Sequence, residues 1–437
     1  MTDPISQAIE FYEAGRFDEA AQFCRALLLR QPDHIEASHL LGVIYYRQGK
    51  TAAARDLLKR ATELPGATAR MHNNFGAVLN ELGKAEEAAI QFRRVLALEP
   101  DNYWALNNLG VFYRDTKRTD AAVDAFKQAL ALKPGFPEAE INLRSIYRDL
   151  VPQWHFAMMN DDARNTAYRA AIERCVRGKR VLDIGTGGGL LALMAAHAGA
   201  ASITTCESIG VIANKAREIV SRNGFDGKIT VVGKRSRDLA VGVDLPDRAE
   251  VLITETFSSD IIDEGILPTI EHAHQYLLVR EATIIPCAAS AMGFLVGGVL
   301  LEQMLSVEKI QEFDLSLFNE FAPPIFAVAL DTVPHEVLSA DVELFRFDLR
   351  QHQFPMVGRE IAITATATGL CLGVAQWIKL QLDSETSYCN QPVAGGHNIH
   401  WPNRIFRFPK PVPVRAGEVV RVAAHHDRMQ LKVSLAK

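Results

Sequence analysis

A 34-residue period runs through roughly the first third of this 437-residue chain and constrains its fold more than any other feature. A shift by this period superimposes four alanines, Ala20, Ala54, Ala88 and Ala122. The same shift aligns Ala8 with Gly42, Gly76 and Gly110, and it aligns Gly15 with Gly49, Gly83 and Lys117. It also aligns Pro32 with Pro100 and Pro134, while Pro65 stands one place early. Small residues let two antiparallel helices approach closely, and a proline ends the second helix. Each repeat is therefore predicted to be a helical hairpin.

The fourth repeat reads ALNNLGVFYRDTKRTDAAVDAFKQALALKPG and resembles the tetratricopeptide repeat. The resemblance covers about residues 3–150 and implies a superhelical stack of helix pairs, which we assign to a domain of residues 1–150. Asn74, Asn108 and Asn142 also lie 34 residues apart. The resemblance implies a concave peptide groove in which such asparagines bind the backbone of a partner, although asparagine can equally cap turns or bond between helices.

A glycine turn in the middle of the chain predicts a cofactor site. Residues 179–200 read KRVLDIGTGGGLLALMAAHAGA, a short apolar strand, a glycine turn and an amphipathic helix. Glycines between a strand and a helix let a ligand approach the backbone and meet the unpaired N–H groups of the helix.

The spacing of this turn favours one cofactor class. Gly185, Gly187 and Gly189 form GxGxG, with Leu190 where the dinucleotide pattern needs glycine, so NAD is disfavoured. Asp183 precedes the turn, and the next strand ends at Glu207, whose carboxylate could accept both ribose hydroxyls. This pairing resembles class I S-adenosylmethionine-dependent methyltransferases and implies S-adenosylmethionine as cofactor, with Ser236 near its adenine. The alternative for Glu207 is a solvent-exposed strand end.

One stretch indicates the class of substrate. From Val251 to Leu278 it reads VLITETFSSDIIDEGILPTIEHAHQYLL. Its strand ends at Glu255, and Glu264 follows nine residues later. This resembles the protein arginine methyltransferase family, whose hairpin of two glutamates holds the substrate guanidinium, and EGILPTIEHAHQYL looks most like the monomethylating, type III subfamily. Guanidinium is a planar fork of donors that two carboxylates can grip and orient. Close carboxylates raise each other's pKa, so a cationic substrate would complete the site. The alternative is a pair of surface glutamates in a loop.

Two flanking segments carry the same resemblance. The segment WHFAMMNDDARNTAY, from Trp154 to Tyr168, resembles the family's N-terminal helix, which closes over the cofactor. In this segment Arg164 matches the arginine that pairs the methionyl carboxylate, and Met158 matches a substrate-binding methionine, with a core position as its alternative. Near the C-terminus, GGHNIHWPNRIF contains His400 and Trp401. The resemblance implies a catalytic His400 that orients a glutamate or relays a proton, and a Trp401 that lines the arginine channel.

The histidine and the tryptophan could instead pack at a barrel rim. Ile399 stands where the family has threonine, which leaves the number of transferred methyl groups open.

Alternating segments such as EIAITATATG and EVVRVAAHHD predict half-buried strands, so residues from about Pro286 onward form a β-rich domain. It resembles the barrel of the same family. Within it, IQEFDLSLFNEFAPP, at about residues 308–325, stands in the place of a helical dimerisation arm, which implies a homodimer. The alternative is an extra loop helix without a partner.

Composition excludes several other classes. Lys and Arg number 47 against 52 Asp and Glu, so we expect no nucleic-acid partner. The six cysteines form no CxxC pair, which suggests neither a zinc site nor disulfides but reduced thiols in the cytoplasm. The N-terminus lacks the features of a signal peptide. The uncharged stretch Ile284 to Leu301 contains Pro286 and three glycines, so we expect a buried strand and turn and no membrane span.

These observations predict a multidomain chain. A tetratricopeptide solenoid (1–150) precedes an α/β, Rossmann-like methyltransferase domain (151–285) and a β-barrel-like substrate domain (286–437). The predicted reaction is methyl transfer from S-adenosylmethionine to a protein or peptide arginine, without a metal. One alternative is a scaffold protein that binds partners through its repeats and carries an inactive methyltransferase fold. The other is methylation of a nucleophile other than arginine.

Overall fold

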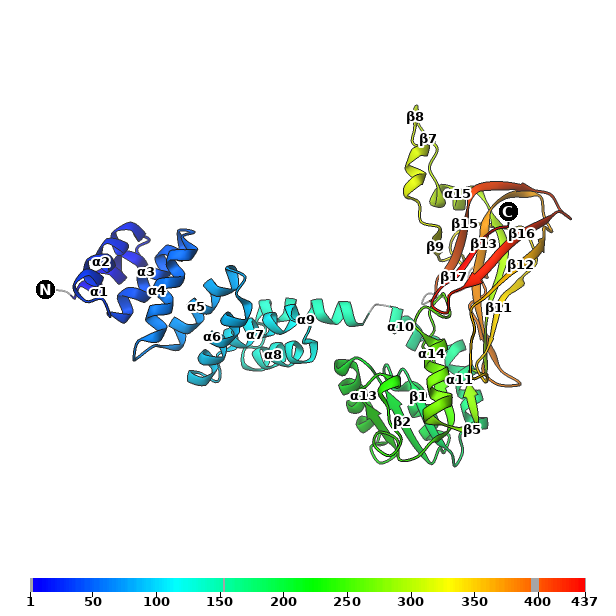
Figure 1. Ribbon diagram of the computed structural model, residues 1–437, viewed down its shortest axis with the longest axis horizontal. Helices are drawn as coiled ribbons and strands as arrows, with labels where there is room; N and C mark the ends of the chain where they lie inside the picture. The colour runs from blue at the N-terminus through cyan, green and yellow to red at the C-terminus, as the bar shows by residue number, and fades with distance from the viewer. Residues whose placement is uncertain (1–2, 152–153, 394–400, 437) are drawn as a thin grey trace. The chain divides into compact units, whose positions relative to one another are not determined.

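The computed structural model describes residues 3–151, 154–393 and 401–436. The chain forms two compact units that divide between residues 151 and 152 (Figure 1). The predicted further division of the second unit at residues 285 and 286 stays a prediction, although the parallel strands end at Ile285 and the first antiparallel strand begins at Ala288.

The first unit is helical throughout its described residues. Its helices are α1 (Pro4–Glu13), α2 (Phe17–Arg30), α3 (Ile35–Arg47), α4 (Thr51–Glu63), α5 (Ala69–Glu81), α6 (Ala85–Leu98), α7 (Tyr103–Asp115), α8 (Thr119–Leu132) and α9 (Pro137–Leu150). Helices α1 to α8 pack as four consecutive hairpins, and α9 packs on α7 and α8. The prediction of repeated helical hairpins is therefore confirmed.

The recurring small residues explain how closely these helices pack. A Cβ atom on Gly76 of α5 would lie 2.6 Å from Cε1 of Phe92 on α6. A Cβ atom on Gly110 of α7 would lie 2.5 Å from Cε1 of Phe126 on α8. Each aromatic ring thus occupies the space that a larger residue would need.

The turn between the two helices of a repeat also has a conformational requirement. Gly49 and Gly83 adopt φ values of 73° and 72°, which glycine reaches without steric cost. In the fourth repeat Lys117 occupies the equivalent position at φ 59°. The turn geometry is therefore retained even where glycine is absent.

The second unit begins with helices and a parallel sheet. The strands are β1 (Arg180–Ile184), β2 (Ser202–Cys206), β3 (Ile229–Val232), β4 (Ala249–Thr254) and β5 (Leu278–Ile285). Their order is β3-β2-β1-β4-β5 and every neighbouring pair is parallel. The order reverses between β1 and β4, the place where open α/β sheets bind ligands.

Helices and short turns precede or connect these strands. They are α10 (Trp154–Met159), α11 (Asp162–Cys175), α12 (Leu190–His197), α13 (Gly210–Arg222), the 3-10 turn η1 (Ser236–Asp238), α14 (Ile266–His272) and the π-helical turn η2 (Ala273–Leu277). The continuous helix that the sequence suggested over residues 154–168 is broken. Asp161 caps α11 by accepting a hydrogen bond from the backbone N–H of Arg164 at 2.9 Å, which starts a new helix.

Antiparallel strands form the rest of the second unit. The larger sheet contains β6 (Ala288–Gly297), β9 (Ile325–Val328), β10 (Glu336–Val337), β11 (Val342–Asp348), β13 (Gly369–Gln381), β14 (Ser387–Cys389) and β15 (Asn403–Val414). The smaller sheet contains β12 (Val357–Thr364), β16 (Val419–His426) and β17 (Leu431–Leu435). The predicted β-rich region is confirmed, while its closure into a barrel stays a prediction.

A segment between β6 and β9 projects from the larger sheet in Figure 1. It contains α15 (Val299–Leu305), the short hairpin of β7 (Lys309–Ile310) and β8 (Phe313–Asp314), and the 3-10 helix η3 (Ser316–Phe321). This segment corresponds to the predicted arm.

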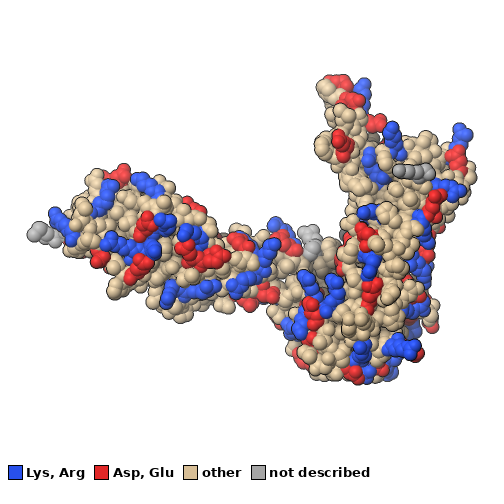
Figure 2. All heavy atoms as spheres, in the orientation of Figure 1, with Lys and Arg blue, Asp and Glu red and all other residues tan. Residues whose placement is uncertain are grey.

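One hydrophobic core joins the parallel and antiparallel sheets. Val181 and Ile253 of the parallel strands belong to the same buried cluster as Ile378 and Phe406 of the antiparallel strands. No helix in the described ranges has the length and apolar character needed to cross a membrane. On the face shown in Figure 2, basic and acidic side chains are interspersed over both units.

The close packing of α5 on α6 predicts a large effect of one methyl group. Gly76→Ala should destabilise the repeat unit by about 1–3 kcal/mol, because the new Cβ atom overlaps the Phe92 ring. Chemical denaturation followed by circular dichroism would measure the change. Phe92→Leu in the same chain should recover part of the loss. A gain of up to about 1 kcal/mol, which helix propensity alone would give, would contradict the packing argument.

Candidate functional site

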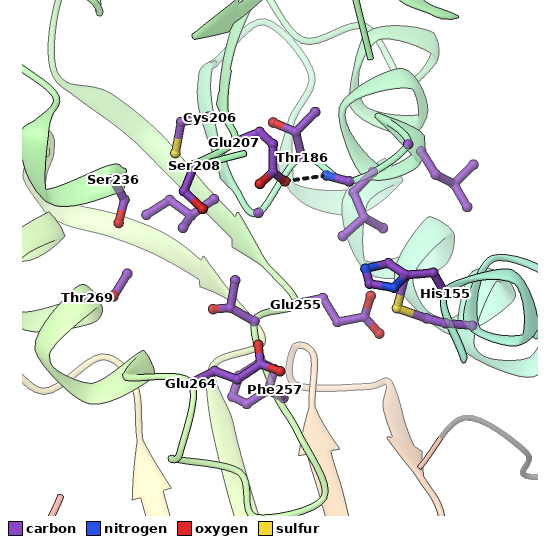
Figure 3. Close-up of a pocket in the computed structure, with 18 of the residues that line it drawn as sticks. His155, Thr186, Cys206, Glu207, Ser208, Ser236, Glu255, Phe257, Glu264 and Thr269 are labelled. Atoms are coloured by element: carbon purple, nitrogen blue, oxygen red, sulfur yellow. Dashed lines mark hydrogen bonds between the residues drawn. The ribbon is translucent and has the colours of Figure 1, made fainter. Parts of the chain in front are cut away.

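A pocket of about 410 Å³ opens at the carboxyl ends of the parallel strands. It lies where the strand order reverses, so the segments that follow β1 and β4 both line it. Figure 3 shows Glu207, Ser208 and Thr186 on one side of the pocket, with Glu255, Glu264 and His155 on another. The pocket therefore brings together the glycine turn that begins at Gly185 and the glutamate pair that begins at Glu255, which lie about 70 residues apart in the sequence.

The glycine loop, residues 185–189, forms one wall of this pocket. Gly185 has a φ of 90°, and a Cβ atom there would lie 2.7 Å from Cγ2 of Thr256. Gly189 caps the N-terminus of α12 at φ 84°. Gly185, Thr186, Gly187 and Gly188 line the pocket, whereas Gly189 does not. A Cβ atom on Gly187 would meet nothing within 4 Å, so the loop leaves open space beside its backbone for a ligand.

Glu207 follows β2 and lines the same wall. Its carboxylate accepts hydrogen bonds from the backbone N–H of Gly187 at 3.2 Å, drawn in Figure 3, and of Ile209 at 3.0 Å. These bonds fix the carboxylate at the edge of the glycine loop. Glu207 is therefore part of the site and not a solvent-exposed strand end.

Asp183 lies behind the loop and does not line the pocket. It is 1% exposed and accepts a 2.7 Å hydrogen bond from the Thr205 hydroxyl, which in turn lies 2.5 Å from the hydroxyl of pocket-lining Thr186. Its other carboxylate oxygen has no hydrogen-bond partner among the described residues. Burial raises the pKa of Asp183 to about 6, the Thr205 hydrogen bond opposes this, and the nearby Glu207 carboxylate adds to it.

Arg164 and Glu255 form a buried ion pair. Arg164 of α11 donates through Nε and Nη2 to the two carboxylate oxygens of Glu255, and both side chains are almost fully buried. Nη1 donates to Asn165 at 2.6 Å, and the guanidinium lies 5.3 Å from the centre of the Tyr168 ring. The predicted cofactor-binding arginine therefore pairs with the predicted catalytic glutamate in this structure.

Glu264 lies at the other end of the glutamate hairpin, residues 255–264, just before α14. Its side chain also lines the pocket and points into it in Figure 3. The residue is accessible because the pocket is open, yet surrounding atoms displace water from its carboxylate, and this displacement raises the pKa of Glu264, as does neighbouring Asp263. A cationic ligand would therefore stabilise the charged form of the Glu264 carboxylate.

Helix α10 covers a further wall of the pocket. Met158 and His155 both line it, and the His155 ring stacks on Trp154 at 3.8 Å between centroids. Met158 is therefore not a core residue. Phe156, which the sequence placed beside His155, is 59% exposed and does not line the pocket.

Ser236 lines the pocket from η1, while its predicted place near an adenine stays a prediction. Sequence reasoning missed several other lining residues, most of which are chain neighbours of predicted ones, namely Trp154, Met159, Thr186, Ser208, Lys234, Arg235, Arg237, Thr256, Phe257 and Thr269. Adjacency to the motifs could have identified most of them, but Thr269 of α14 needs the three-dimensional structure. Among the described residues, no group of three or more His, Cys, Asp or Glu could hold a metal ion.

The predicted histidine and tryptophan lie at the boundary where the last described range, residues 401–436, begins. His400 lies outside the described residues. Trp401 is buried, its ring lies 5.9 Å from that of Tyr388, and its carbonyl accepts a 3.1 Å hydrogen bond from Asn390. Trp401 does not line the pocket, so its place in a substrate channel stays a prediction.

The predicted asparagines of the repeats fall on α5, α7 and α9. Asn74 lies 2.9 Å from Nε2 of His39 on α3, and Asn142 donates to Asn107 on α7 at 3.1 Å. Both therefore bond between neighbouring repeats. Asn108 is half-buried and makes no hydrogen bond through its side chain to another described residue.

Comparison with sequence families identifies three segments. Two tetratricopeptide-repeat family models match residues 11–73 and 67–134. A model described as ribosomal protein L11 methyltransferase (PrmA) matches residues 169–264. The repeats are thus tetratricopeptide repeats, and the methyltransferase model covers most of the residues that line the pocket.

The second unit is similar to named arginine methyltransferases. An arginine N(omega)-methyltransferase of Streptomyces achromogenes subsp. streptozoticus is 39% identical over 65% of this chain and 79% of the relative. Protein arginine N-methyltransferase 7 of Drosophila willistoni is 30% identical over 63% of this chain and 46% of the relative. The corresponding rice (Oryza sativa subsp. indica) protein is 30% identical over 64% and 44%. The chain therefore spans less than half the length of these latter two relatives.

Solved structures share the fold at lower identity. A PRMT1 enzyme-prozyme complex of Trypanosoma brucei with AdoHcy has a TM-score of 0.56 and 22% identity, and the match covers 65% of this chain and 93% of the other. Protein arginine methyltransferase 10 of Arabidopsis thaliana has a TM-score of 0.51 and 18% identity, with 61% and 85% covered. The parallel sheet followed by antiparallel sheets is the architecture that these proteins share with this chain.

The burial of Asp183 predicts a pH-dependent stability effect. The folded chain keeps the proton of this carboxyl up to about pH 6, whereas the unfolded chain loses it near 3.8. The folded state therefore binds more protons between these values, so the contribution of Asp183 to stability falls as pH rises through this window. Asp183→Asn removes the buried charge and should stabilise the fold at pH 8 by roughly 2–3 kcal/mol, at about 1.4 kcal/mol per pKa unit, and by about half of that at pH 5.

Thermal unfolding of the two chains at both pH values measures this difference. Asp348→Asn is the control, because Arg350 lowers the pKa of Asp348 and the substitution should give no gain at pH 8. Equal effects of Asp183→Asn at pH 5 and pH 8 would contradict the buried-charge argument.

Proposed function

Because the chain belongs to the arginine N-methyltransferase family, we propose that it transfers a methyl group from S-adenosylmethionine to the guanidinium of an arginine in a protein or peptide. One observation carries this proposal. Glu255 and Glu264 line the same pocket as the glycine loop and Arg164. A cofactor site and a pair of carboxylates suited to guanidinium thus share one cavity.

The residues present fit S-adenosylmethionine. The glycine loop leaves room beside its backbone, and Glu207 can accept the ribose hydroxyls. Ser236 lines the same pocket and is our proposed residue beside the adenine. Arg164 can pair the methionyl carboxylate. When bound, the cofactor supplies an electrophilic methyl group on a sulfonium. Asp183 supports the loop from behind through Thr205 and Thr186.

The ion pair between Arg164 and Glu255 relates cofactor binding to substrate binding. While Glu255 accepts from Nε and Nη2 of Arg164, its oxygens are engaged. If Arg164 turns to the methionyl carboxylate, Glu255 can accept N–H groups of the substrate guanidinium. We therefore expect the cofactor to bind before the arginine.

The two glutamates then orient the guanidinium and draw positive charge from it. Each carboxylate can accept two N–H groups in a planar arrangement, which directs one guanidinium nitrogen toward the methyl group. Exclusion of water strengthens both interactions. A cation beside Glu264 would also offset the raised pKa that the displacement of water from its carboxylate causes. His400 is our proposed proton relay after transfer.

The proposed product is monomethylarginine. The segment EGILPTIEHAHQYL supports this proposal, because it resembles the monomethylating, type III subfamily. Amino-acid analysis of the methylated product distinguishes monomethylarginine from dimethylarginine. This assignment concerns the number of methyl groups and is independent of the activity itself.

Free arginine is a second candidate substrate. The relative with 39% identity is named an arginine N(omega)-methyltransferase, without the word protein. The same two carboxylates would bind the guanidinium of the free amino acid. Parallel assays with free arginine and with an arginine-containing peptide separate the two candidates.

We propose that the repeats recruit a protein partner, which the tetratricopeptide architecture supports. Asn74 and Asn142 bond between helices. Of the three asparagines spaced 34 residues apart, Asn108 therefore has the most hydrogen-bonding capacity left for a peptide backbone. Trp401, placed at the arginine channel by resemblance, belongs to the same proposed route for a polypeptide substrate.

The six cysteines are all unpaired, which supports a reducing compartment such as the cytoplasm.

The projecting arm is proposed to mediate homodimerisation. Its exposed apolar side chains include Ile310, Phe313, Leu317, Phe318 and Phe321, which are 52–88% exposed. A concentration of exposed apolar side chains on one segment is typical of a protein interface. The family resemblance supports a second copy of the chain as the occupant.

Substitution of the glutamates tests the proposed chemistry. Glu255→Gln and Glu264→Gln should each lower methyl transfer by about 100-fold or more, because a neutral amide stabilises the developing charge less. Cofactor affinity measured by calorimetry should not weaken in Glu255→Gln, since Arg164 loses a competitor for the methionyl carboxylate. Radiolabelled methyl transfer to a peptide and to free arginine provides the activity measurement.

Glu360→Gln serves as the control, because this glutamate forms an exposed ion pair with Arg421 and neither residue lines the pocket. Wild-type protein that binds the cofactor but methylates neither peptide nor free arginine would reject the proposed activity. It would favour the scaffold alternative or a different nucleophile.

The arm predicts a change of oligomeric state. Leu317→Lys together with Phe321→Lys should shift the chain from dimer to monomer in sedimentation velocity, since two charges replace exposed apolar contacts. Glu320→Lys on the same segment is the control and should leave the dimer intact. A monomeric wild-type chain would contradict the proposal.

A further inference from the structure

The centre of the glutamate hairpin contains a residue in an unfavourable backbone conformation. Ile261 has a φ of 73° and is fully buried. A β-branched residue rarely adopts positive φ, and such a conformation persists only where surrounding contacts impose it. One local contact is the hydrogen bond from the N–H of Ile261 to the carbonyl of Ser258 at 2.9 Å. The remaining constraints come from the antiparallel strands.

Asp260, next to Ile261, is bound by two of these strands. Its side chain is 1% exposed and accepts a hydrogen bond from Nη1 of Arg404 on β15, which is 15% exposed. It also accepts from the backbone N–H of Leu431 on β17 at 3.1 Å. These contacts join positions 144 and 171 residues apart in the sequence.

A second contact holds the adjacent residue. Gln376 of β13 is buried and donates through Nε2 to the carbonyl of Ser259 at 2.9 Å. Gln376 and Arg404 are paired across β13 and β15. Two neighbouring side chains of the larger antiparallel sheet thus hold two consecutive residues of the hairpin.

The two glutamates stand at the ends of this same hairpin. Glu255 directly follows β4, and Glu264 lies two residues before α14. A shift at the centre of the hairpin therefore changes the direction of both carboxylates relative to each other. Misplacement of a reacting group by about 1 Å can cost about 100-fold in rate.

Building on the proposed function, we infer that Asp260 and Arg404 are positioning residues, whose buried ion pair fixes the glutamate hairpin against the antiparallel sheet so that Glu255 and Glu264 face one guanidinium. Neither side chain lines the pocket, so both act through the hairpin. Burial raises the pKa of Asp260 to about 6 while Arg404 lowers it, so the arginine also keeps this carboxylate charged at neutral pH. The antiparallel sheet thereby contributes to catalysis without contacting the reacting atoms.

The test compares Arg404→Met and Arg404→Lys with Arg421→Met, which removes the exposed ion pair on β16. Arg404→Met should lower kcat for an arginine peptide about 10- to 100-fold, while the dissociation constant for S-adenosylhomocysteine stays within about twofold of wild type. Arg404→Lys should recover part of kcat, because it keeps the charge. Arg421→Met should match wild type in both measurements. Equal losses of kcat and cofactor affinity in Arg404→Met would overturn the inference.

Hydrogen exchange provides a readout that does not depend on activity. Amides of residues 256–264 should exchange faster in Arg404→Met, while those of β1 and β4 keep their protection. Unchanged exchange in the hairpin would also overturn the inference. If the wild-type chain methylates no arginine, the proposed function fails, whereas the exchange result still decides whether the pair positions the hairpin.

Should Arg404→Met not fold, the double variant Asp260→Asn with Arg404→Gln removes both buried charges and keeps a hydrogen-bonding pair. It should fold and show hairpin exchange closer to wild type than Asp260→Asn alone. Exchange in the double variant as fast as in the single variant would count against coupling between the two residues.

Discussion

A buried positive charge needs a partner, and the arrangement of this pocket follows from the charges that surround Arg164. Glu255 satisfies Arg164 directly, while Glu207 and Glu264 line the same cavity and Asp183 lies behind its wall. Lys234, Arg235 and Arg237 line the cavity as well, so the pocket as a whole carries mixed charge. Glu255 and Glu264 both belong to the glutamate hairpin, and loss of water already raises the pKa of Glu264. A cationic group bound between these two carboxylates would therefore be stabilised, which matches the chemistry of methyl transfer to arginine.

The sequence could predict those parts of the molecule whose determinants lie close together in the chain. The 34-residue period, the glycine loop and the spacing of Glu255 and Glu264 are local patterns. In the structure the period appears as helical hairpins, and the glycine loop and the two glutamates line one pocket. The prediction of one helix over residues 154–168 was wrong, because an aspartate cap at Asp161 outweighed helical periodicity.

Contacts between distant segments could not be predicted in the same way. The pair of Asp260 and Arg404 depends on the register of β13 against β15, which no local pattern specifies. The same holds for the packing of Trp401 on Tyr388 and for the hydrogen bonds that Asn74 and Asn142 make to neighbouring repeats. The residue types indicated that these side chains would form ion pairs, ring contacts or hydrogen bonds. Only the tertiary structure shows which residue each of them contacts.

Lys117 has a consequence for how the two units can change during evolution. It holds the conformation that glycine adopts in the other repeats, yet the fourth hairpin keeps its form, because small packing residues and helix ends specify the same turn independently. The repeats therefore carry redundant information, and a single substitution can accumulate without loss of register. The strained segment around Ile261 occurs once in the described chain and has no duplicate. Sequence drift should consequently be tolerated in the array long before it is tolerated in the glutamate hairpin.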